Sequence, residues 1–209
     1  MNAIAAEWLW TNGRRPRWTP PEGTADVDRD LVEQAQRGDR EAFAILARTH
    51  GDRLIGLAQR ILRDLGRAED AVQQTLVIAW RELPRLRDPE RFEVWINRTL
   101  VRTCFAEARR ARAWSSQIRV LTIEPAVPDA SHALANRDLL ERGFRRLPPE
   151  QRAILVLRHY LGLEPAEIAE TLGIKEGTAR SRLHYAHRAM RAALEADERS
   201  LAVAGGPRP

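Results

Sequence analysis

The sequence contains one cysteine, Cys104, and one lysine, Lys175. A single cysteine excludes an internal disulfide framework and a cysteine-rich zinc site. No apolar run approaches the ~20 residues that a membrane helix needs. The first residues place their positive charges after a short apolar stretch, which is the reverse of a secretory signal. We therefore expect a cytoplasmic, nucleoid-associated protein without direct membrane insertion.

Aromatic residues are scarce, at 6% of 209 residues, whereas alanine, leucine and arginine are frequent. Strong helix formers therefore dominate, few stretches look like β-strands, and the composition predicts an all-α fold. The net charge is +5, and its positive side is almost wholly arginine. Because arginine binds phosphates and base edges through a planar fork, nucleic acid is a reasonable partner.

Prolines, glycines and charge divide the chain into five segments. Residues 28–112 and 136–199 are predicted to be two small helical domains, the second with a helix-turn-helix. Residues 113–135 hold several prolines and polar residues and are predicted to be a flexible linker. Residues 1–27 and 200–209 are predicted to be flexible tails. Neither domain is strongly basic, so any nucleic-acid surface must be local.

In the first domain, apolar residues recur at helical spacing and predict four helices. The first helix spans Leu31 to Ala47 with an interruption at residues 38–39, and the second covers residues 54–62. The third and fourth are predicted at residues 67–83 and 90–112, separated by a proline-containing break. Each is amphipathic, so the four are expected to bury one small core together.

The second domain contains the strongest motif, PAEIAETLGIKEGTARSRLHYAHRAMRAAL, which is typical of a helix-turn-helix. Pro165 suits the first turn of one helix, and Gly173 allows the positive φ that ends it. A second helix is predicted from about Glu176 to Leu194. No acid occurs in it from Gly177 onward, although several arginines do. An acid-free basic face beside a tight turn favours a helix that lies in a DNA major groove.

The first turns of such a helix would meet the bases. The predicted DNA-contacting set is Lys175, Thr178, Arg180, Ser181, Arg182, His184, Tyr185 and Arg188. Within it, Arg182 and Arg188 are suited to hold phosphates, whereas Arg180, Ser181, His184 and Tyr185 are the candidates for base contact. The same pattern is compatible with a solvated helix hairpin that binds no DNA.

The chain resembles the extracytoplasmic-function (ECF) sigma factors, the smallest group of the primary bacterial sigma family. In the first domain the resemblance rests on GDREAFAIL, RLIGLAQRILRDLGRAEDAVQQTLVIAWREL and LRDPERFEVWINRTLVRTC; in the second it rests on LPPEQRAILVLRHYLGLEPAEIAETLGIKEGTARSRLHYA. It implies a transcription initiation factor. The first domain would bind the clamp helices of the largest subunit of core RNA polymerase and open the promoter −10 element. The second would read the −35 element and touch the polymerase flap, and an anti-sigma factor often holds such proteins inactive.

The resemblance also assigns residues in the first domain. It places the flipped −10 base at the loop around Arg87 and Asp88, and arginines of the following helix fit both phosphates and base faces. The predicted −10 and melting set is Arg87, Asp88, Arg91, Arg98, Arg102 and Arg109. Family members commonly carry asparagine where this chain has Arg102. The predicted polymerase-binding set is Asp70, Gln73 and Gln74, within AEDAVQQT. Trp95 could stack on a base, but a lone tryptophan on an apolar helix side is expected in the core.

Three other classes of protein are alternatives to a sigma factor. A stand-alone helix-turn-helix regulator would typically pair as a dimer, and no sustained heptad for dimerisation is visible. An enzyme or metalloprotein could use His184 and His187 at i, i+3, but no nearby acid or thiol completes a metal shell. No metal, cofactor or catalytic residue is therefore expected. A helical adaptor that binds only protein leaves the acid-free arginine face unexplained.

Overall fold

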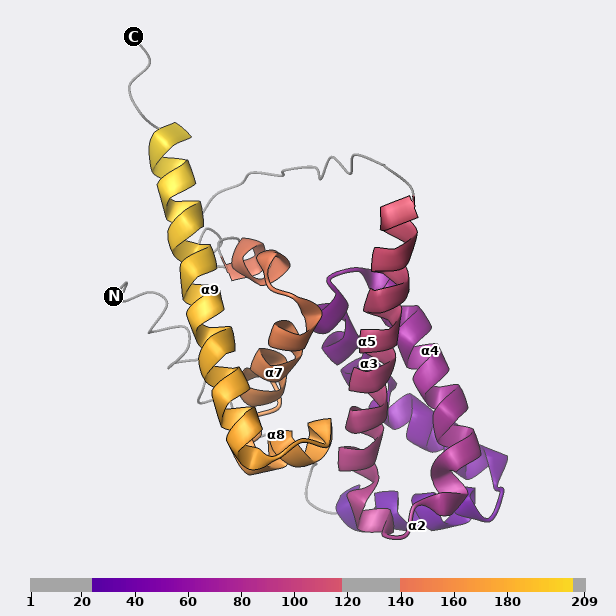
Figure 1. Ribbon diagram of the computed structural model, residues 1–209. Helices are drawn as coiled ribbons and strands as arrows, with labels where there is room; N and C mark the ends of the chain where they lie inside the picture. Colours follow the sequence, from indigo (N-terminus) through magenta and orange to yellow (C-terminus); the bar gives the residue numbers. More distant parts are fainter. Residues whose placement is uncertain (1–23, 118–139, 205–209) are drawn as a thin grey trace.

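The computed structural model describes residues 24–117 and 140–204, and all regular elements in these ranges are helices. The helices form two units that lie side by side (Figure 1). The amino-terminal unit consists of α2 (Thr24–Gln36), α3 (Arg40–Leu62), α4 (Leu65–Glu82), the short 3-10 helices η2 (Leu83–Arg85) and η3 (Pro89–Arg91), and α5 (Phe92–Gln117). The carboxyl-terminal unit consists of helical residues 140–146, α7 (Pro149–His159), α8 (Pro165–Leu172) and α9 (Glu176–Ala204). The predicted all-α fold with a helix-turn-helix in its second part is confirmed.

The interruption predicted at residues 38–39 separates α2 from α3. Gly38 has φ +94°, and the carboxylate of Asp39 accepts hydrogen bonds from the backbone N–H groups of Glu41 (2.9 Å) and Ala42 (3.2 Å). This is an N-cap, and it starts α3 at residue 40. The predicted division between the first two helices is wrong, because residues 40–62 form one unbroken helix. Gly51 lies within it, and a single glycine weakens a helix by only ~1 kcal/mol.

Three predicted boundaries are also wrong by several residues. Helix α2 begins at Thr24 rather than near Leu31, α5 runs to Gln117 rather than 112, and α9 runs to Ala204 rather than about Leu194. None of these extensions contains proline or glycine. A helix continues past its last apolar contact when no breaker stops it. The rest of the predicted linker and of the tails lies outside the described residues.

Buried leucine and isoleucine side chains hold each unit together. The largest ones in the amino-terminal unit are Leu46, Leu54, Leu57, Ile61, Leu83, Ile96 and Leu100, and those in the carboxyl-terminal unit are Ile154, Leu157 and Ile168. Trp95 is partly buried and packs against the core as expected, with its ring centroid 6.1 Å from that of Phe92. In the described residues, no helix combines the length and apolar character of a membrane span.

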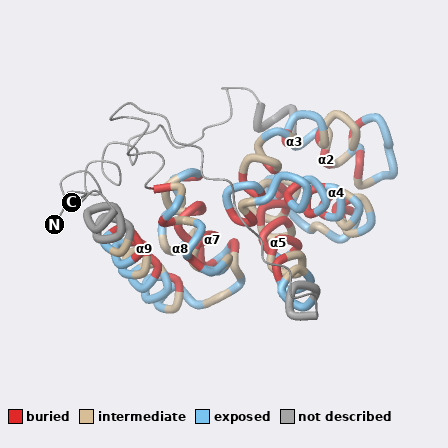
Figure 2. The backbone as a smooth tube through the Cα atoms, turned by 90° about the horizontal axis from the view of Figure 1, so that it is seen from above, coloured by how far each residue is buried: buried red, intermediate tan, exposed pale blue. Residues whose placement is uncertain are grey.

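The two units contact each other directly. Helix α7 packs against α3 and α5, and α8 packs against α5. Seen from above, α7 and α8 lie between α9 on one side and α5 on the other, and buried backbone gathers where these helices face one another (Figure 2). This docking leaves the outer side of α9 exposed and brings the helix-turn-helix close to α5.

Candidate DNA-binding and polymerase-binding surfaces

The turn between α8 and α9 has the geometry that the sequence predicts. Gly173 has φ +66° and ends α8, and the backbone N–H of Ile174 donates to the carbonyl of Ala169 (2.9 Å). Ile174 packs against the core, and α9 begins two residues later. A left-handed glycine followed by a buried apolar residue is a helix C-terminus that redirects the chain sharply. It sets the angle between the two helices of the motif.

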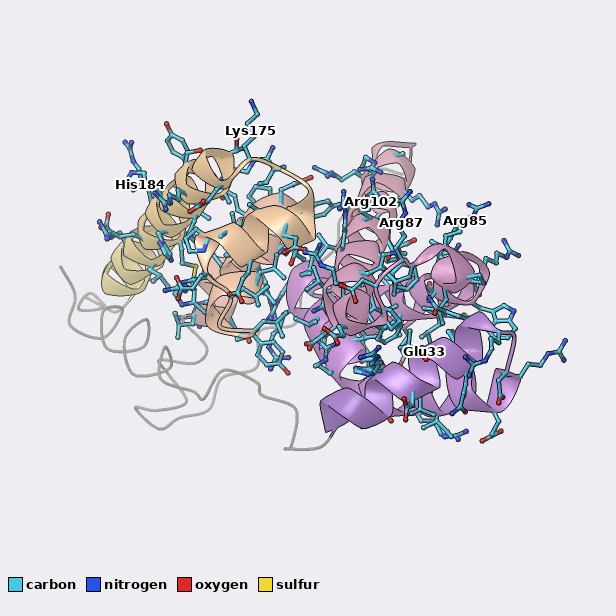
Figure 3. The ribbon with its side chains drawn as sticks, turned by 90° about the horizontal axis from the view of Figure 1, so that it is seen from below. Glu33, Arg85, Arg87, Arg102, Lys175 and His184 are labelled. Atoms are coloured by element: carbon cyan, nitrogen blue, oxygen red, sulfur yellow. The ribbon has the colours of Figure 1, made fainter. Side chains whose placement is uncertain are left out.

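Helix α9 presents one buried and one exposed side. Ala179, Ala186, Met190 and Leu194 are buried, and Leu183 packs partly against the core. The predicted DNA-contacting residues lie on the other side: Lys175, Arg180, Ser181, Arg182, His184, Tyr185 and Arg188 are all exposed, and Thr178 is half-buried. Tyr185 exposes 60% of its surface, which is unusual for a large ring. Figure 3 shows Lys175 and His184 projecting away from the carboxyl-terminal unit.

One acid reaches this exposed face from the first turn of α9. A carboxylate oxygen of Glu176 lies 2.5 Å from Nη2 of Arg180, one turn further along. The Ser181 hydroxyl donates to the carbonyl of Thr178 (3.0 Å). The Glu176 pair holds the guanidinium of Arg180 near the start of the helix, which is the part that enters a groove in helix-turn-helix complexes.

Hydrogen bonds at the start of α8 fix it against α7. The backbone N–H of Glu164 donates to the carboxylate of Glu167 (2.7 Å), and Nη1 of Arg158 lies 2.6 Å from the carboxylate of Glu164. Glu164 is the N-cap of α8, and its carboxylate ties α8 to the end of α7. Helix α9, which follows α8, is thus carried on helices that are tied to each other.

A pair of histidines joins α7 to α9. The Nε2 atoms of His159 and His187 are 2.8 Å apart. Burial, followed by the neighbouring His187 and Arg158, lowers the pKa of His159 to about 4, and burial also lowers the pKa of His187. Both rings are therefore neutral near pH 7 and share a hydrogen bond. The described ranges hold no group of three or more His, Cys, Asp or Glu that could bind a metal.

Three of the predicted −10 residues form a line along α5. Arg98, Arg102 and Arg109 fall within about 40° of one another when successive residues are placed ~100° apart around the helix. Arg102 and Arg109 are exposed, and Arg98 is half-buried. Arg87 and Arg102 lie on the same side of the view as Lys175 in Figure 3. Lys175 of the carboxyl-terminal unit and these two arginines of the amino-terminal unit are thus seen on one side of the molecule.

The loop before α5 is held in shape by its own side chains. The carboxylate of Asp88 accepts a hydrogen bond from the backbone N–H of Glu90 (3.0 Å) and so caps η3. From α2, Nε2 of Gln36 donates to the carbonyls of Leu83 (3.2 Å) and Leu86 (2.6 Å). Asp88 therefore acts on the backbone of the loop, while the neighbouring Arg87 is exposed.

The predicted polymerase-binding residues share an exposed stripe of α4. Asp70, Gln73 and Gln74 are all exposed, and Val77 extends the stripe with 39% of its surface exposed. The sequence analysis did not single out Val77.

The structure also reveals contacts that sequence reasoning missed. Arg91 forms an ion pair with Glu170 of α8, and the guanidinium of Arg98 lies directly over Gly173. Arg91 and Glu170 are 79 residues apart in the chain. No local pattern marks Glu170, because its role depends on how the two units dock.

Comparison with known proteins agrees with this arrangement. The model of Sigma-70 region 2 matches residues 46–114, and the model of Sigma-70, region 4 matches residues 137–191. The ECF RNA polymerase sigma factor SigL of Mycobacterium tuberculosis is 35% identical over 169 residues, which cover 78% of this chain and 95% of SigL. The chain belongs to the ECF sigma factors. The RNA polymerase sigma-H factor of Pseudomonas aeruginosa is 30% identical over 187 residues, covering 82% of this sigma factor and 96% of that protein.

Two solved structures have a fold similar to that of this chain. The structure of CnrH in complex with the cytosolic domain of CnrY matches with a TM-score of 0.58 and 27% identity, over 82% of this sigma factor and 99% of that chain. The sigma factor RpoE of Bartonella quintana, in complex with the anti-sigma factor NepR, has a TM-score of 0.59 at 21% identity, over 74% of this chain and 98% of that one, and supports the fold. The protein is therefore a sigma factor for transcription initiation.

Proposed function

We propose that this sigma factor directs core RNA polymerase to promoters by reading the −35 element with α9 and opening the −10 element with α5 and the loop before it. The observation that carries the proposal is the exposed face of α9, which follows a helix-turn-helix turn and has no acid after Glu176 until Glu195. In a chain rich in acids, such a face fits the negative potential of a DNA groove.

At the −35 element, the exposed residues divide by chemistry. Arg180 at the start of α9 has a planar fork that suits the O6 and N7 acceptors of guanine. Ser181 follows Arg180 directly, and His184 and Tyr185 lie about one turn further along α9. All three are exposed, and they would contact base edges or the thymine methyl. Lys175, Thr178, Arg182 and Arg188 flank them and would contact phosphates, which fixes register without reading sequence.

At the −10 element, the line of arginines on α5 supplies the affinity. Arg98, Arg102 and Arg109 run along one face, and unpaired DNA offers both phosphates and base faces to a guanidinium. Arg87 and Arg91 lie at the loop where a flipped base would be held, and Asp88 keeps that loop in shape through η3. Trp95 packs partly in the core, so its part in this surface is to support the helix.

For polymerase, the stripe of Asp70, Gln73, Gln74 and Val77 on α4 is the proposed contact with the clamp helices. It lies on a helix whose other face is buried against α3 and α5, so it is presented rigidly. The carboxyl-terminal unit would contact the flap, and the stretch between residues 117 and 140 would connect the two. We assign the polymerase and −10 role to the unit that ends at residue 117, and the −35 role to the unit that the structure describes from residue 140.

We further propose regulation by an anti-sigma factor. Support comes from CnrH, which has the same fold at 27% identity and was solved with the cytosolic domain of CnrY. The factor would act in the cytoplasm on the nucleoid, without a cofactor and without catalysis of its own, because polymerase supplies the chemistry.

The test is run-off transcription with purified core polymerase on a library of promoter fragments, with transcript ends identified by sequencing. We expect transcripts only when the factor is added, from templates that share two separated elements. Asp70→Arg should abolish these transcripts, while Glu33→Gln, on the surface of α2, serves as the matched control. Duplex binding by the protein alone, with no transcript from any template, would support a stand-alone regulator instead.

A further inference from the structure

Glu176 brings a negative charge to the start of α9, beside the residues proposed to contact the −35 element. The next carboxylate along this helix is Glu195, about five turns further on. On α8, Glu164 and Glu170 form ion pairs with arginines that are not part of α9. Because DNA is negatively charged, a carboxylate at the start of α9 opposes binding to every sequence alike. A benefit of Glu176 to DNA binding would therefore have to come from specificity.

The carboxylate of Glu176 is joined to Arg180. Its Oε1 atom lies 2.5 Å from Nη2 of Arg180, four residues further along the helix. A glutamate that precedes an arginine by four residues is in the favourable order for a helix ion pair. Both side chains stay open to solvent, with 46% of Glu176 and 69% of Arg180 exposed. A guanidinium has five N–H donors, so this contact leaves others available to a base.

The ion pair places the carboxylate close to any base that Arg180 contacts. A guanidinium binds O6 and N7 of guanine at about 2.9 Å, so a carboxylate paired with it lies within about 6 Å of that base. The residue after Glu176 is Gly177, and a Cβ built at that position would meet no atom within 4 Å. No side chain at position 177 therefore keeps a base edge away from Glu176.

We propose that Glu176 is a specificity-determining residue for the −35 element, which selects cytosine or adenine beside the guanine that Arg180 contacts. This rests on the proposed function, which assigns the −35 element to α9. In the major groove, cytosine and adenine each present an amino donor, whereas guanine and thymine present none. A carboxylate accepts a hydrogen bond from an amino group and repels the oxygen acceptors of guanine and thymine. Glu176 thus acts mainly by excluding the wrong bases.

The test uses the complete factor bound to core polymerase. Duplex promoter fragments carry a randomised −35 region, and sequencing of the bound fragments gives a base-preference profile for each variant. Binding to duplexes of unrelated sequence, at several salt concentrations, measures the affinity that does not depend on sequence. Circular dichroism shows whether each variant keeps its helices, because an acid in the first turn also stabilises α9.

The deciding variant is Glu176→Ala, and Arg180→Ala identifies the guanine position in the profile. We expect Glu176→Ala to lower the preference at a neighbouring position about three- to tenfold and to bind unrelated duplexes about two- to threefold more tightly, since a negative charge no longer faces the DNA. Glu176→Gln should broaden the preference at that position, because an amide both donates and accepts. The matched control, Glu195→Ala, removes an equal charge from an exposed position further along α9 and should keep the wild-type profile.

Two outcomes overturn the proposal. If Glu176→Ala keeps the wild-type profile, weaker binding would mean that Glu176 only stabilises the helix, and tighter binding would mean that it only repels DNA in general. If the profile changes at the guanine position alone, Glu176 acts on Arg180 and selects no base itself. Failure of the proposed function is seen separately, when Arg180→Ala and Glu176→Ala both leave the profile unchanged.

Discussion

Arg53 and Asn97 join α3 to α5 inside the amino-terminal unit. Nη1 of Arg53 donates to Oδ1 of Asn97 (3.0 Å) and lies 3.4 Å from the carboxylate of Glu93. The Arg53 side chain is only 10% exposed, and Asn97 is only 4% exposed. A guanidinium in such a place needs its partners, because losing one leaves a buried charge poorly compensated. The pair therefore fixes the rotation of α5 and the direction of its arginines.

We predict that Asn97→Ala lowers the free energy of unfolding by about 2–4 kcal/mol, because it leaves the buried Arg53 without its amide partner. The matched control is Arg48→Ala, which removes an exposed pair with Glu41 (3.0 Å). That loss should be below about 0.5 kcal/mol. Urea unfolding followed by circular dichroism measures both. Equal losses in the two variants would show that the buried Arg53–Asn97 pair contributes no more to stability than the exposed Arg48–Glu41 pair.

The histidine pair predicts a dependence of stability on pH. Burial, followed by His187 and Arg158, lowers the pKa of His159 to about 4 in the folded protein. An unfolded histidine has a pKa near 6.5, so between these values the unfolded chain binds the proton more readily. Stability is therefore fully present above about pH 6.5 and is lost as the pH falls toward 4. From pH 7 to pH 5 we expect a loss of about 1 kcal/mol from this pair, after allowing for solvent screening.

The variant that checks this effect combines His159→Gln with His187→Gln. Its free energy of unfolding should change less between pH 7 and pH 5 than that of wild type, because neither glutamine titrates. Gln73→Ala is the control, since Gln73 is exposed on α4 and carries no titratable group, and it should leave the dependence at its wild-type value. An identical pH dependence in the double variant and wild type would mean that other groups cause it.

Two structural features at position 173 favour glycine over any other residue. Its φ is +66°, and the guanidinium of Arg98 fills the space where a Cβ would lie. We predict that Gly173→Ala lowers the free energy of unfolding by about 1–2 kcal/mol through backbone strain alone. It should also displace Arg98 and reduce contact between the units. Gly177→Ala is the control, because Gly177 lies within α9 with open space at its Cβ position. It should be neutral or stabilise the protein by up to about 1 kcal/mol, as urea unfolding would show.

The local features of the fold were predictable from sequence. The stripe from Ala179 to Leu194 and the turn at Gly173 depend on residues a few positions apart, and helical periodicity and glycine chemistry report these directly. The break at Gly38 and Asp39 was predictable for the same reason. Helix ends were less so, because α5 continues to Gln117 and α9 continues to Ala204 through stretches that contain no proline or glycine.

The contacts between helices that are far apart in the sequence could not be predicted. His159 and His187 are 28 residues apart, and Arg91 and Glu170 are 79 apart. Such pairs depend on how complete helices pack, and an exposed glutamate has no local sign of its partner. The predicted DNA-contacting residues of α9 are exposed except for the half-buried Thr178, but no local pattern in the sequence indicates that α8 partly covers α5.

The exposed stripe on α4 predicts which substitutions weaken binding to core polymerase. Asp70→Arg reverses a charge in it, and Val77→Ala removes its exposed apolar side chain. We expect Asp70→Arg to weaken binding to core polymerase at least tenfold and Val77→Ala to weaken it several-fold, since central interface residues carry most of the binding energy. Circular dichroism should show both variants folded. Full affinity in both variants would place the polymerase contact elsewhere.

Arg180 and Arg182 are two residues apart on α9 and are predicted to act differently on the −35 element. Arg180→Ala removes a base contact, so preference at one −35 position should relax by ~1–3 kcal/mol. Arg182→Ala removes a phosphate contact, so binding should weaken on all sequences alike and the salt dependence should fall by about one unit of slope. The measurement is binding of the polymerase complex to promoters that carry each single substitution in the −35 element, at several salt concentrations. An unchanged preference profile for Arg180→Ala would remove that residue from the reading set, and a changed profile for Arg182→Ala would place Arg182 among the residues that contact bases.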